Sequence, residues 1–163
     1  MAYLFATIAL ALAPALAHGE VRGMCTASET VYFSCPTAGA KSVSLCGAGP
    51  GHLQYRFGKP GKPEFSFPSD GKDGARSMRL AHYFRYQVDR TEVSFSNQEN
   101  DYSLYDYTED GKRSAGVRVV TAAGKEVDIA CSKPIQSRLG KLEGVLACDA
   151  DNALSMGACP AEK

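Results

Sequence analysis

The sequence lacks several features that would point to a particular activity. Its 163 residues include no tryptophan and three histidines, and 18 lysines and arginines balance 18 aspartates and glutamates. Nucleic acids and anionic membranes are bound through an excess of basic side chains. A formal net charge of zero therefore excludes both as expected partners. The scarcity of histidine also leaves few candidates for the commonest general base.

Enzyme motifs are missing as well. There is no G-x-S-x-G elbow, no glycine-rich phosphate loop before a helix and no H-E-x-x-H, which mark common hydrolases and nucleotide-binding enzymes. The cysteines form no C-x₂₋₄-C pair of the kind that structural zinc sites use. We predict a protein without enzymatic activity or cofactor. A pair of carboxylates that converge in space stays open, because such a pair needs no sequence spacing.

Only one long hydrophobic run occurs, from Ala2 to Ala17, and it ends in Ala15-Leu16-Ala17. This ending fits the small-x-small rule for signal peptidase, and the run is too short for a comfortable transmembrane span of about 20 residues. We predict a signal peptide over residues 1–17 and one domain over residues 18–163. The protein is expected to be exported, periplasmic or secreted, without a transmembrane segment; its oligomeric state is left open.

An exported chain meets an oxidising environment, which favours disulfides. We predict three bridges among Cys25, Cys35, Cys46, Cys131, Cys148 and Cys159. The long cysteine-free stretch between Cys46 and Cys131 suggests that bridges tie the two ends of the chain together. A Cys35–Cys46 bridge is disfavoured, because in a tight hairpin near Gly39 Cys35 would face residue 42 or 43. The other pairings stay open.

Apolar residues recur at every second position after Thr30, which is the period of a half-buried strand. Glycine, proline and aspartate clusters separate these runs. The pattern predicts an all-β fold, an antiparallel meander that forms a sandwich or a barrel. After Pro134 the spacing changes and predicts one short C-terminal helix over residues 136–147. The expected strands are 30–35, 41–46, 52–57, 64–67, 80–88, 91–96, 102–107, 116–121 and 126–131.

Charge is unevenly ordered along the chain. From Thr91 to Asp110 the sequence holds six acidic residues and no basic one, together with three tyrosines. Tyrosine supplies contact area at low entropic cost and carboxylates steer encounter, so this region is a candidate surface for a cationic protein. The alternative is a solvated hairpin with ordinary cross-strand tyrosines. The candidate residues are Glu99, Asp101, Tyr102, Tyr105, Asp106 and Tyr107.

An exported, cysteine-bridged, antiparallel β domain resembles the periplasmic lysozyme inhibitors and toxin-immunity proteins of Gram-negative bacteria. Architecture and compartment carry this resemblance. Ser114-Ala115-Gly116 has the composition of the inhibitors' short Ser-Gly loop but not its pattern, so no inhibitory residue is carried over to this sequence. The resemblance implies a binding protein that inhibits a cationic cell-wall-active enzyme, such as a lysozyme or a muramidase-like toxin.

Two other functions stay open. Cleavage after Ala17 would expose His18, and His18-Gly19-Glu20-Val21 resembles the first residues of exported lytic polysaccharide monooxygenases. That resemblance implies a copper site made by the amine and imidazole of His18 with His82 or His52. A structural or small-ligand-binding envelope protein would instead hold an apolar cavity between its sheets, lined by Phe57, Phe65, Phe67 and Phe84.

Overall fold

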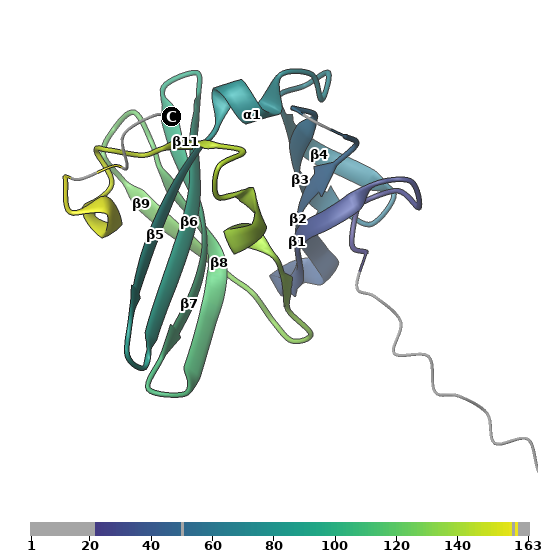
Figure 1. Cartoon of the computed structure of the whole chain (residues 1–163). Coiled ribbons are helices and arrows are strands. Elements are labelled where there is room, and N and C mark those ends of the chain that lie inside the picture. The colour runs from purple at the N-terminus through teal and green to yellow at the C-terminus, as the bar shows by residue number, and fades with distance from the viewer. Residues whose placement is uncertain (1–21, 50, 158, 160–163) are drawn as a thin grey trace, which may run out of the picture.

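The alternating side chains build two separate sheets that face each other, as the computed structural model shows (Figure 1). The structure describes residues 22–49, 51–157 and 159, so the predicted signal peptide lies outside the described residues. Neither sheet closes on itself. Of the two predicted architectures, the sandwich is the one that forms.

The five-stranded sheet has the strand order β10-β1-β2-β3-β4, and all its pairings are antiparallel. Its strands are β1 (Thr30–Thr37), β2 (Lys41–Gly47), β3 (Leu53–Lys59), β4 (Lys62–Phe67) and β10 (Gln136–Ser137).

The six-stranded sheet has the order β11-β5-β6-β7-β8-β9, with only the short β11–β5 pairing parallel. A single helical turn, α1 (Gly74–Ser77), precedes this sheet along the chain. The strands are β5 (Arg79–Arg85), β6 (Val88–Asn97), β7 (Asn100–Glu109), β8 (Lys112–Val120), β9 (Glu126–Ala130) and β11 (Ala147–Cys148).

The prediction of an all-β meander is confirmed. The nine predicted strands correspond to β1–β9 in order, and the structure lengthens several of them; the predicted strand 102–107, for example, is Asn100–Glu109. In the β1–β2 hairpin Cys35 lies opposite Val43, as the tight-turn argument requires. Alternation therefore located the strands, while the exact ends depend on cross-strand pairing.

The core lies between the two sheets. Phe33, Leu45 and Tyr55 come from one sheet, Val93 and Leu104 from the other, and all five side chains are buried. Burial of one such side chain contributes about 1.5–3 kcal/mol to folding. The rings of β4 complete the contact between the sheets, since the ring centroids of Phe67 and Phe95 lie 4.4 Å apart in a stacked arrangement.

The predicted helix over residues 136–147 is matched only loosely, by a 3₁₀ turn of four residues. Gln136–Ser137 instead joins the edge of β1 as β10, a short 3₁₀ turn follows at Leu139–Leu142, and Ala147–Cys148 pairs with β5 as β11. The apolar spacing still had a cause, because Leu139, Leu142 and Leu146 are buried between the sheets. Gly144 breaks the pattern at φ +78°, which glycine adopts without steric cost.

All six cysteines form disulfides, as predicted: Cys25–Cys46, Cys35–Cys131 and Cys148–Cys159. Only Cys35–Cys131 ties distant parts of the chain, 96 residues apart. The other two bridges each hold a terminal segment against the outer face of one sheet.

Candidate functional site

Strand alternation divides the six predicted recognition residues between two faces of the sheet. Asp101, Tyr105 and Tyr107 point to the outer face of the six-stranded sheet, away from the core residue Leu104, whereas Tyr102 and Asp106 point to the other face. Glu99 is exposed in the turn between β6 and β7. The acidic and aromatic block of the sequence is therefore not one surface, because neighbours along a strand point in opposite directions.

The two inward residues have structural partners. The ring of Tyr102 stacks on Phe95 at 4.9 Å and on Phe65 at 5.2 Å between centroids. Asp106 accepts two hydrogen bonds from Arg113, at 2.8 and 2.9 Å. Tyr102 therefore belongs to the packing between the sheets, and Asp106 to a bidentate ion pair.

The two outward tyrosines belong to a polar network around Glu92 of β6, which is only 5% exposed. Tyr107 Oη donates a hydrogen bond to Glu92 Oε1, and Asn152 Nδ2 donates one to Oε2 at 2.7 Å. Arg118 Nη1 lies 3.7 Å from the same carboxylate, and its guanidinium covers the ring of Tyr105 at 5.5 Å. We call these five residues the Glu92 network.

Burial and acceptor carboxylates raise the pKa of the two tyrosines further above neutral pH. Burial raises the pKa of Tyr105 to about 12, and Asp128, which accepts its hydrogen bond at 3.2 Å, adds to the shift. Burial, followed by the hydrogen bond to Glu92, raises the pKa of Tyr107 above its ordinary value. Each hydroxyl donates to a carboxylate, Tyr105 to Asp128 and Tyr107 to Glu92. The Glu92 network orders this face and holds Asn152 against it.

Glu92, Arg118 and Asn152 were not among the residues singled out in the sequence. Glu92 has the outward parity of β6, opposite to that of Val93, and it lies directly opposite Tyr105 across β6 and β7. A correct pairing of β6 with β7 would have placed Glu92 beside Tyr105. No sequence pattern points to Asn152, because only the fold brings the C-terminal segment over β6.

The segment Asp149–Met156, which we call the C-terminal strap, crosses the outer face of the six-stranded sheet. Its bonds to the sheet are Asp149 N–H to Leu80 O at 2.9 Å, Ser94 Oγ to Asp149 Oδ2, and Asn152 to Glu92. The Cys148–Cys159 bridge closes a loop around it.

One hollow on this face, of about 620 Å³, has a charged lining with one more carboxylate than guanidinium groups. Three carboxylates border it, those of Asp101, Asp149 and Asp151, beside the guanidinium groups of Arg76 and Arg79. None of the salt bridges in the described part of the chain uses any of the three carboxylates. We call this region the acidic hollow; its remaining lining residues are Ser77, Ser94, Phe95, Ser96, Ser103 and Asn152.

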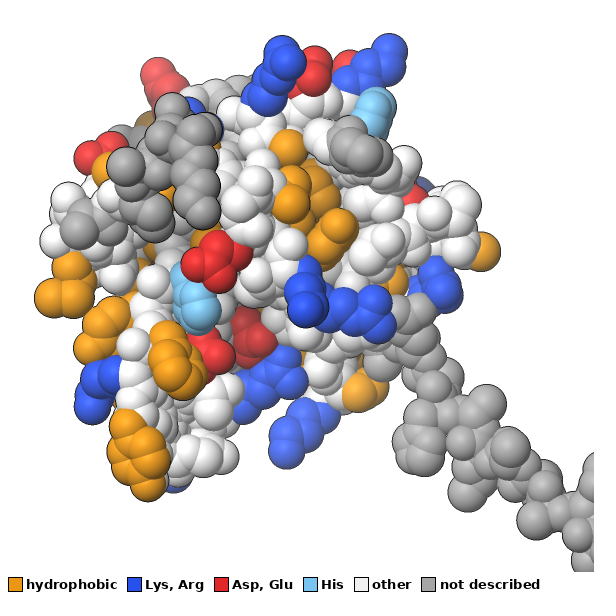
Figure 2. Space-filling view, in the orientation of Figure 1, with side chains coloured by type: hydrophobic (Ala, Val, Ile, Leu, Met, Phe, Trp, Pro, Cys, Tyr) orange, Lys and Arg blue, Asp and Glu red, His pale blue; other side chains and the backbone are white. Residues whose placement is uncertain are grey.

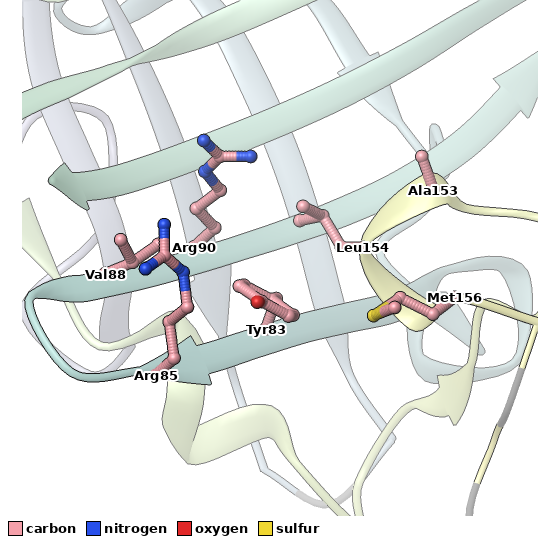
Figure 3. A pocket seen from close by; sticks show the side chains of 7 residues that line it. All are labelled: Tyr83, Arg85, Val88, Arg90, Ala153, Leu154 and Met156. Carbon is pink, nitrogen blue, oxygen red and sulfur yellow. The ribbon is translucent and has the colours of Figure 1, made fainter.

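A second, smaller hollow of about 240 Å³ lies at the other side of the strap (Figure 3). We call it the arginine pocket, because it contains two guanidinium groups and no carboxylate. Its lining residues are Tyr83, Arg85, Val88 and Arg90 of β5 and β6 with Ala153, Leu154 and Met156 of the strap.

Two of the three histidines of the predicted copper site lie among the described residues. His18 lies outside the described residues, and His52 is exposed before β3. His82 Nε2 lies 3.0 Å from Asp89 and Nδ1 lies 3.8 Å from Glu143, so the ring has a carboxylate at each nitrogen. Figure 2 shows both acidic and basic side chains on the face that it draws, in keeping with the balanced charge.

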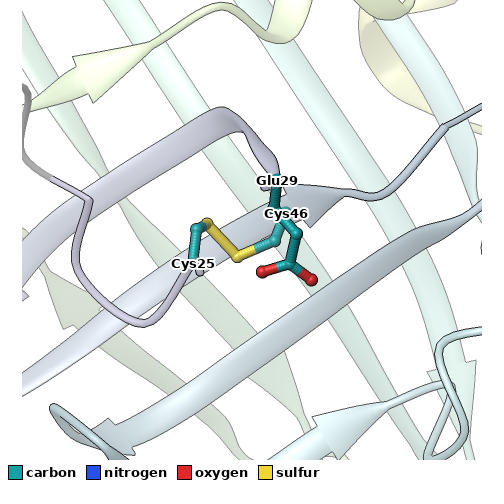
Figure 4. Close-up of side chains that lie close together, drawn as sticks. All are labelled: Cys25, Glu29 and Cys46. Atoms are coloured by element: carbon teal, nitrogen blue, oxygen red, sulfur yellow. A yellow bond between two sulfur atoms is a disulfide. The ribbon is translucent and has the colours of Figure 1, made fainter. Parts of the chain in front are cut away.

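Cys25, Glu29 and Cys46 bring three potential metal-ligand atoms together (Figure 4). The two sulfurs form a disulfide, however, and a metal ligand would have to be a thiolate. Both carboxylate oxygens of Glu29 accept hydrogen bonds from Arg56 at 2.7 Å, and this contact holds the pKa of Glu29 below its ordinary value. The cluster is therefore structural: a disulfide and an ion pair attach residues 25–29 to the five-stranded sheet.

The four phenylalanines predicted to line a ligand cavity do not share one. Phe65 and Phe67 pack against aromatic rings of the opposite sheet, and the ammonium of Lys41 lies 5.1 Å from the ring of Phe57. Phe84 is 73% exposed.

Among the described residues, no helix is long and apolar enough to cross a membrane. Comparison of the chain with protein-family models, with curated proteins and with solved structures found no match.

Proposed function

We propose that the protein is an exported binding protein that neutralises a cationic cell-wall-active enzyme of the lysozyme or muramidase class. The observation that carries the proposal is the acidic hollow, where Asp101, Asp149 and Asp151 border one space of about 620 Å³. A lysine or arginine side chain of a partner is the complementary occupant. Three disulfides in one domain support work in an oxidising compartment.

The charges of the hollow are suited to recognition. Asp101 accepts a hydrogen bond from Ser96 Oγ at 2.6 Å, and Asp149 accepts one from Ser94 Oγ, so neighbouring hydroxyls hold these carboxylates in place. Asp101 and Asp151 are exposed at the rim. Exposed rim charges act mainly on the rate of encounter and its salt dependence. Of the predicted recognition residues, Asp101 is the one that the proposal uses directly.

The Glu92 network supports binding by rigidity. Tyrosine and arginine side chains that are already ordered lose little entropy when a partner docks. Tyr107 and Arg118 are ordered by Glu92, and Asn152 fixes the strap that forms one wall of the hollow. The face is thus preorganised around its acidic rim.

Association with a basic lysozyme tests the proposal. The mature protein should bind an immobilised lysozyme at low ionic strength and reduce its lysis of cell walls. The double variant Asp101→Asn/Asp151→Asn should associate about three- to tenfold more slowly, with a flatter salt dependence.

Asp110→Asn is the control for loss of an acidic charge far from the hollow. Asp110 is exposed in the turn after β7, at the opposite end of the strand from Asp101, and its φ of +47° suits asparagine. It removes one charge and should leave association unchanged. Absence of lysozyme binding, or equal rates for the three proteins, would overturn the proposal.

A further inference from the structure

The arginine pocket has a charge opposite to that of the acidic hollow. Arg85 makes no ion pair or hydrogen bond of its side chain within the described residues, and Arg90 commits only Nε, which donates to Glu109 at 2.8 Å. The Arg90 guanidinium also lies over the ring of Tyr107 at 5.7 Å. The hydrogen bond and the charge of Arg90 lower the pKa of Glu109, and the charge of Arg85 adds to this shift, so both guanidinium groups lie near this one carboxylate. The Arg85 guanidinium and the Nη groups of Arg90 nevertheless donate no hydrogen bond in the part of the chain that the structure describes, and they border the same space.

The rest of the lining is mainly apolar. Val88 is 5% exposed, Leu154 is half-buried, and Met156 stands at the rim with 77% of its surface exposed. Figure 3 shows the ring of Tyr83 between Arg85 on one side and Leu154 and Met156 on the other. The pocket thus has a cationic side and an apolar side.

The size of the pocket limits its occupant. A volume of about 240 Å³ lies below the roughly 300–1,000 Å³ of pockets that enclose drug-sized ligands. The space suits one side chain with its adjoining polar group. A carboxylate is the group whose paired oxygens fit the fork of N–H donors on a guanidinium.

We propose that the arginine pocket binds a carboxylate attached to an apolar side chain, as at the C-terminal residue of a peptide or in a small free acid. The carboxylate contacts Arg85 and the Nη groups of Arg90. The apolar side chain packs on Leu154 beside the ring of Tyr83. This site is separate from the acidic hollow and would take a ligand of the opposite charge.

Titration with N-acetyl-L-leucine, followed by NMR of the backbone amides, tests the proposal. N-acetyl-L-leucinamide has the same side chain without the charge, and acetate has the charge without the side chain. The leucine carboxylate should shift amides of Tyr83–Arg90 and of the strap. Each of the other two compounds should bind at least about tenfold more weakly, because each lacks one half of the ligand.

Two variants locate the contacts. Arg85→Gln should weaken the binding of N-acetyl-L-leucine about tenfold and abolish most of its advantage over the amide. Leu154→Ala should weaken the carboxylate and the amide alike. Lys59→Gln, at an exposed lysine of β3 in the other sheet, removes the same charge and should change nothing. Equal binding of carboxylate and amide, or unchanged binding by Arg85→Gln, would overturn the assignment.

A third comparison distinguishes the source of the carboxylate. A pentapeptide that ends in leucine with a free C-terminus should bind more tightly than N-acetyl-L-leucine if the natural ligand is a protein C-terminus. Equal affinities would assign the pocket to small acids. Absence of binding by both compounds would contradict the proposal.

Discussion

Each outer face of the sandwich carries a terminal segment held by a disulfide, but the two segments cover their faces to different extents. On each face a disulfide holds a terminal segment over polar side chains: Cys25–Cys46 does so over the five-stranded sheet and Cys148–Cys159 over the six-stranded sheet. The first segment covers Ser34 and Ser44, which are fully buried, whereas the strap has a hollow on either side. A covered polar face stabilises the fold, and a partly covered one keeps room for a partner.

Hydrogen bonds and one ion pair hold residues 22–29 against the outer face of the five-stranded sheet. Ser34 and Ser44 are fully buried, and Ser44 Oγ accepts a hydrogen bond from Met24 N–H at 3.0 Å. Arg56 donates to Met24 O at 2.9 Å and pairs with Glu29, whose side chain is 9% exposed. Ser44 and Arg56 thus have partners within residues 22–29, while Ser34 Oγ bonds to Ser44 Oγ at 3.2 Å. We therefore expect substitutions on this face to change stability, and those on the other face to change binding.

The largest effect is expected at Glu29. Glu29→Gln leaves the Arg56 guanidinium on a covered face without its carboxylate, which should lower the free energy of unfolding by about 3 kcal/mol. Urea denaturation measures the change. Glu64→Gln, which breaks the exposed pair of Glu64 with Lys41, is the control and should cost less than about 1 kcal/mol. Similar losses in the two variants would remove the distinction between a covered and an exposed pair.

The same ion pair predicts a pH dependence. The pKa of Glu29 is lower in the folded protein, chiefly through the hydrogen bond from Arg56, so its stabilising contribution is present above the ordinary carboxyl pKa. That contribution is lost as the pH falls through the lower, folded value. The difference in unfolding free energy between the native protein and Glu29→Gln should therefore shrink below about pH 4.5. A constant difference down to pH 2 would contradict this origin.

Gly23 should be the next most sensitive position. It has φ +54°, and a Cβ there would collide with the hydroxyls of Ser34 and Ser44. Gly23→Ala should cost about 2 kcal/mol in thermal or urea unfolding, from backbone strain and overpacking together. Gly124→Ala has a similar φ of +73° and open space around the new methyl, so it should cost only about 1 kcal/mol. Equal costs would show that the face is not closed at Gly23.

A smaller and local effect is expected on the open face. Asn152→Ala removes the hydrogen bond to Glu92 and the one that Asn152 Oδ1 accepts from Leu154 N–H at 2.9 Å. Loss of these bonds should cost about 1–2 kcal/mol and speed hydrogen exchange in the strap more than in the strands. Asp151→Ala, at an exposed neighbour, should leave exchange in the strap unchanged. Uniformly faster exchange would mean that the strap does not open separately.

The sequence supplied the architecture because strand periodicity and cysteine chemistry are local signals. Phe33 and Cys35 of β1 and Val43 and Leu45 of β2 share the core face, as their alternation predicts. The alternation fails at Val31, because a bulge between Val31 and Phe33 places Val31 in a separate cluster with Cys25 and Cys46. The segment 136–147 misled because buried leucines at helical spacing also fit an irregular segment that crosses between two sheets. Its backbone is instead committed to β1 and β5, which no local pattern reveals.

The candidate site was less accessible to sequence reasoning. The acidic block around β7 drew attention to Asp101, Tyr105 and Tyr107, which do share the outer face. Its neighbours Tyr102 and Asp106 have the opposite parity. Asp149, Asp151 and Asn152 come from a segment some 50 residues further along the chain. Only the fold joins them to β6 and β7.

Hydrogen exchange of the complex with lysozyme tests most directly the claim that the open face is the recognition surface. The account predicts protection on binding at the rim of the acidic hollow and in the strap, with no change at residues 22–29. Protection confined to residues 22–29 and the five-stranded sheet, with unaltered exchange in the strap, would contradict it.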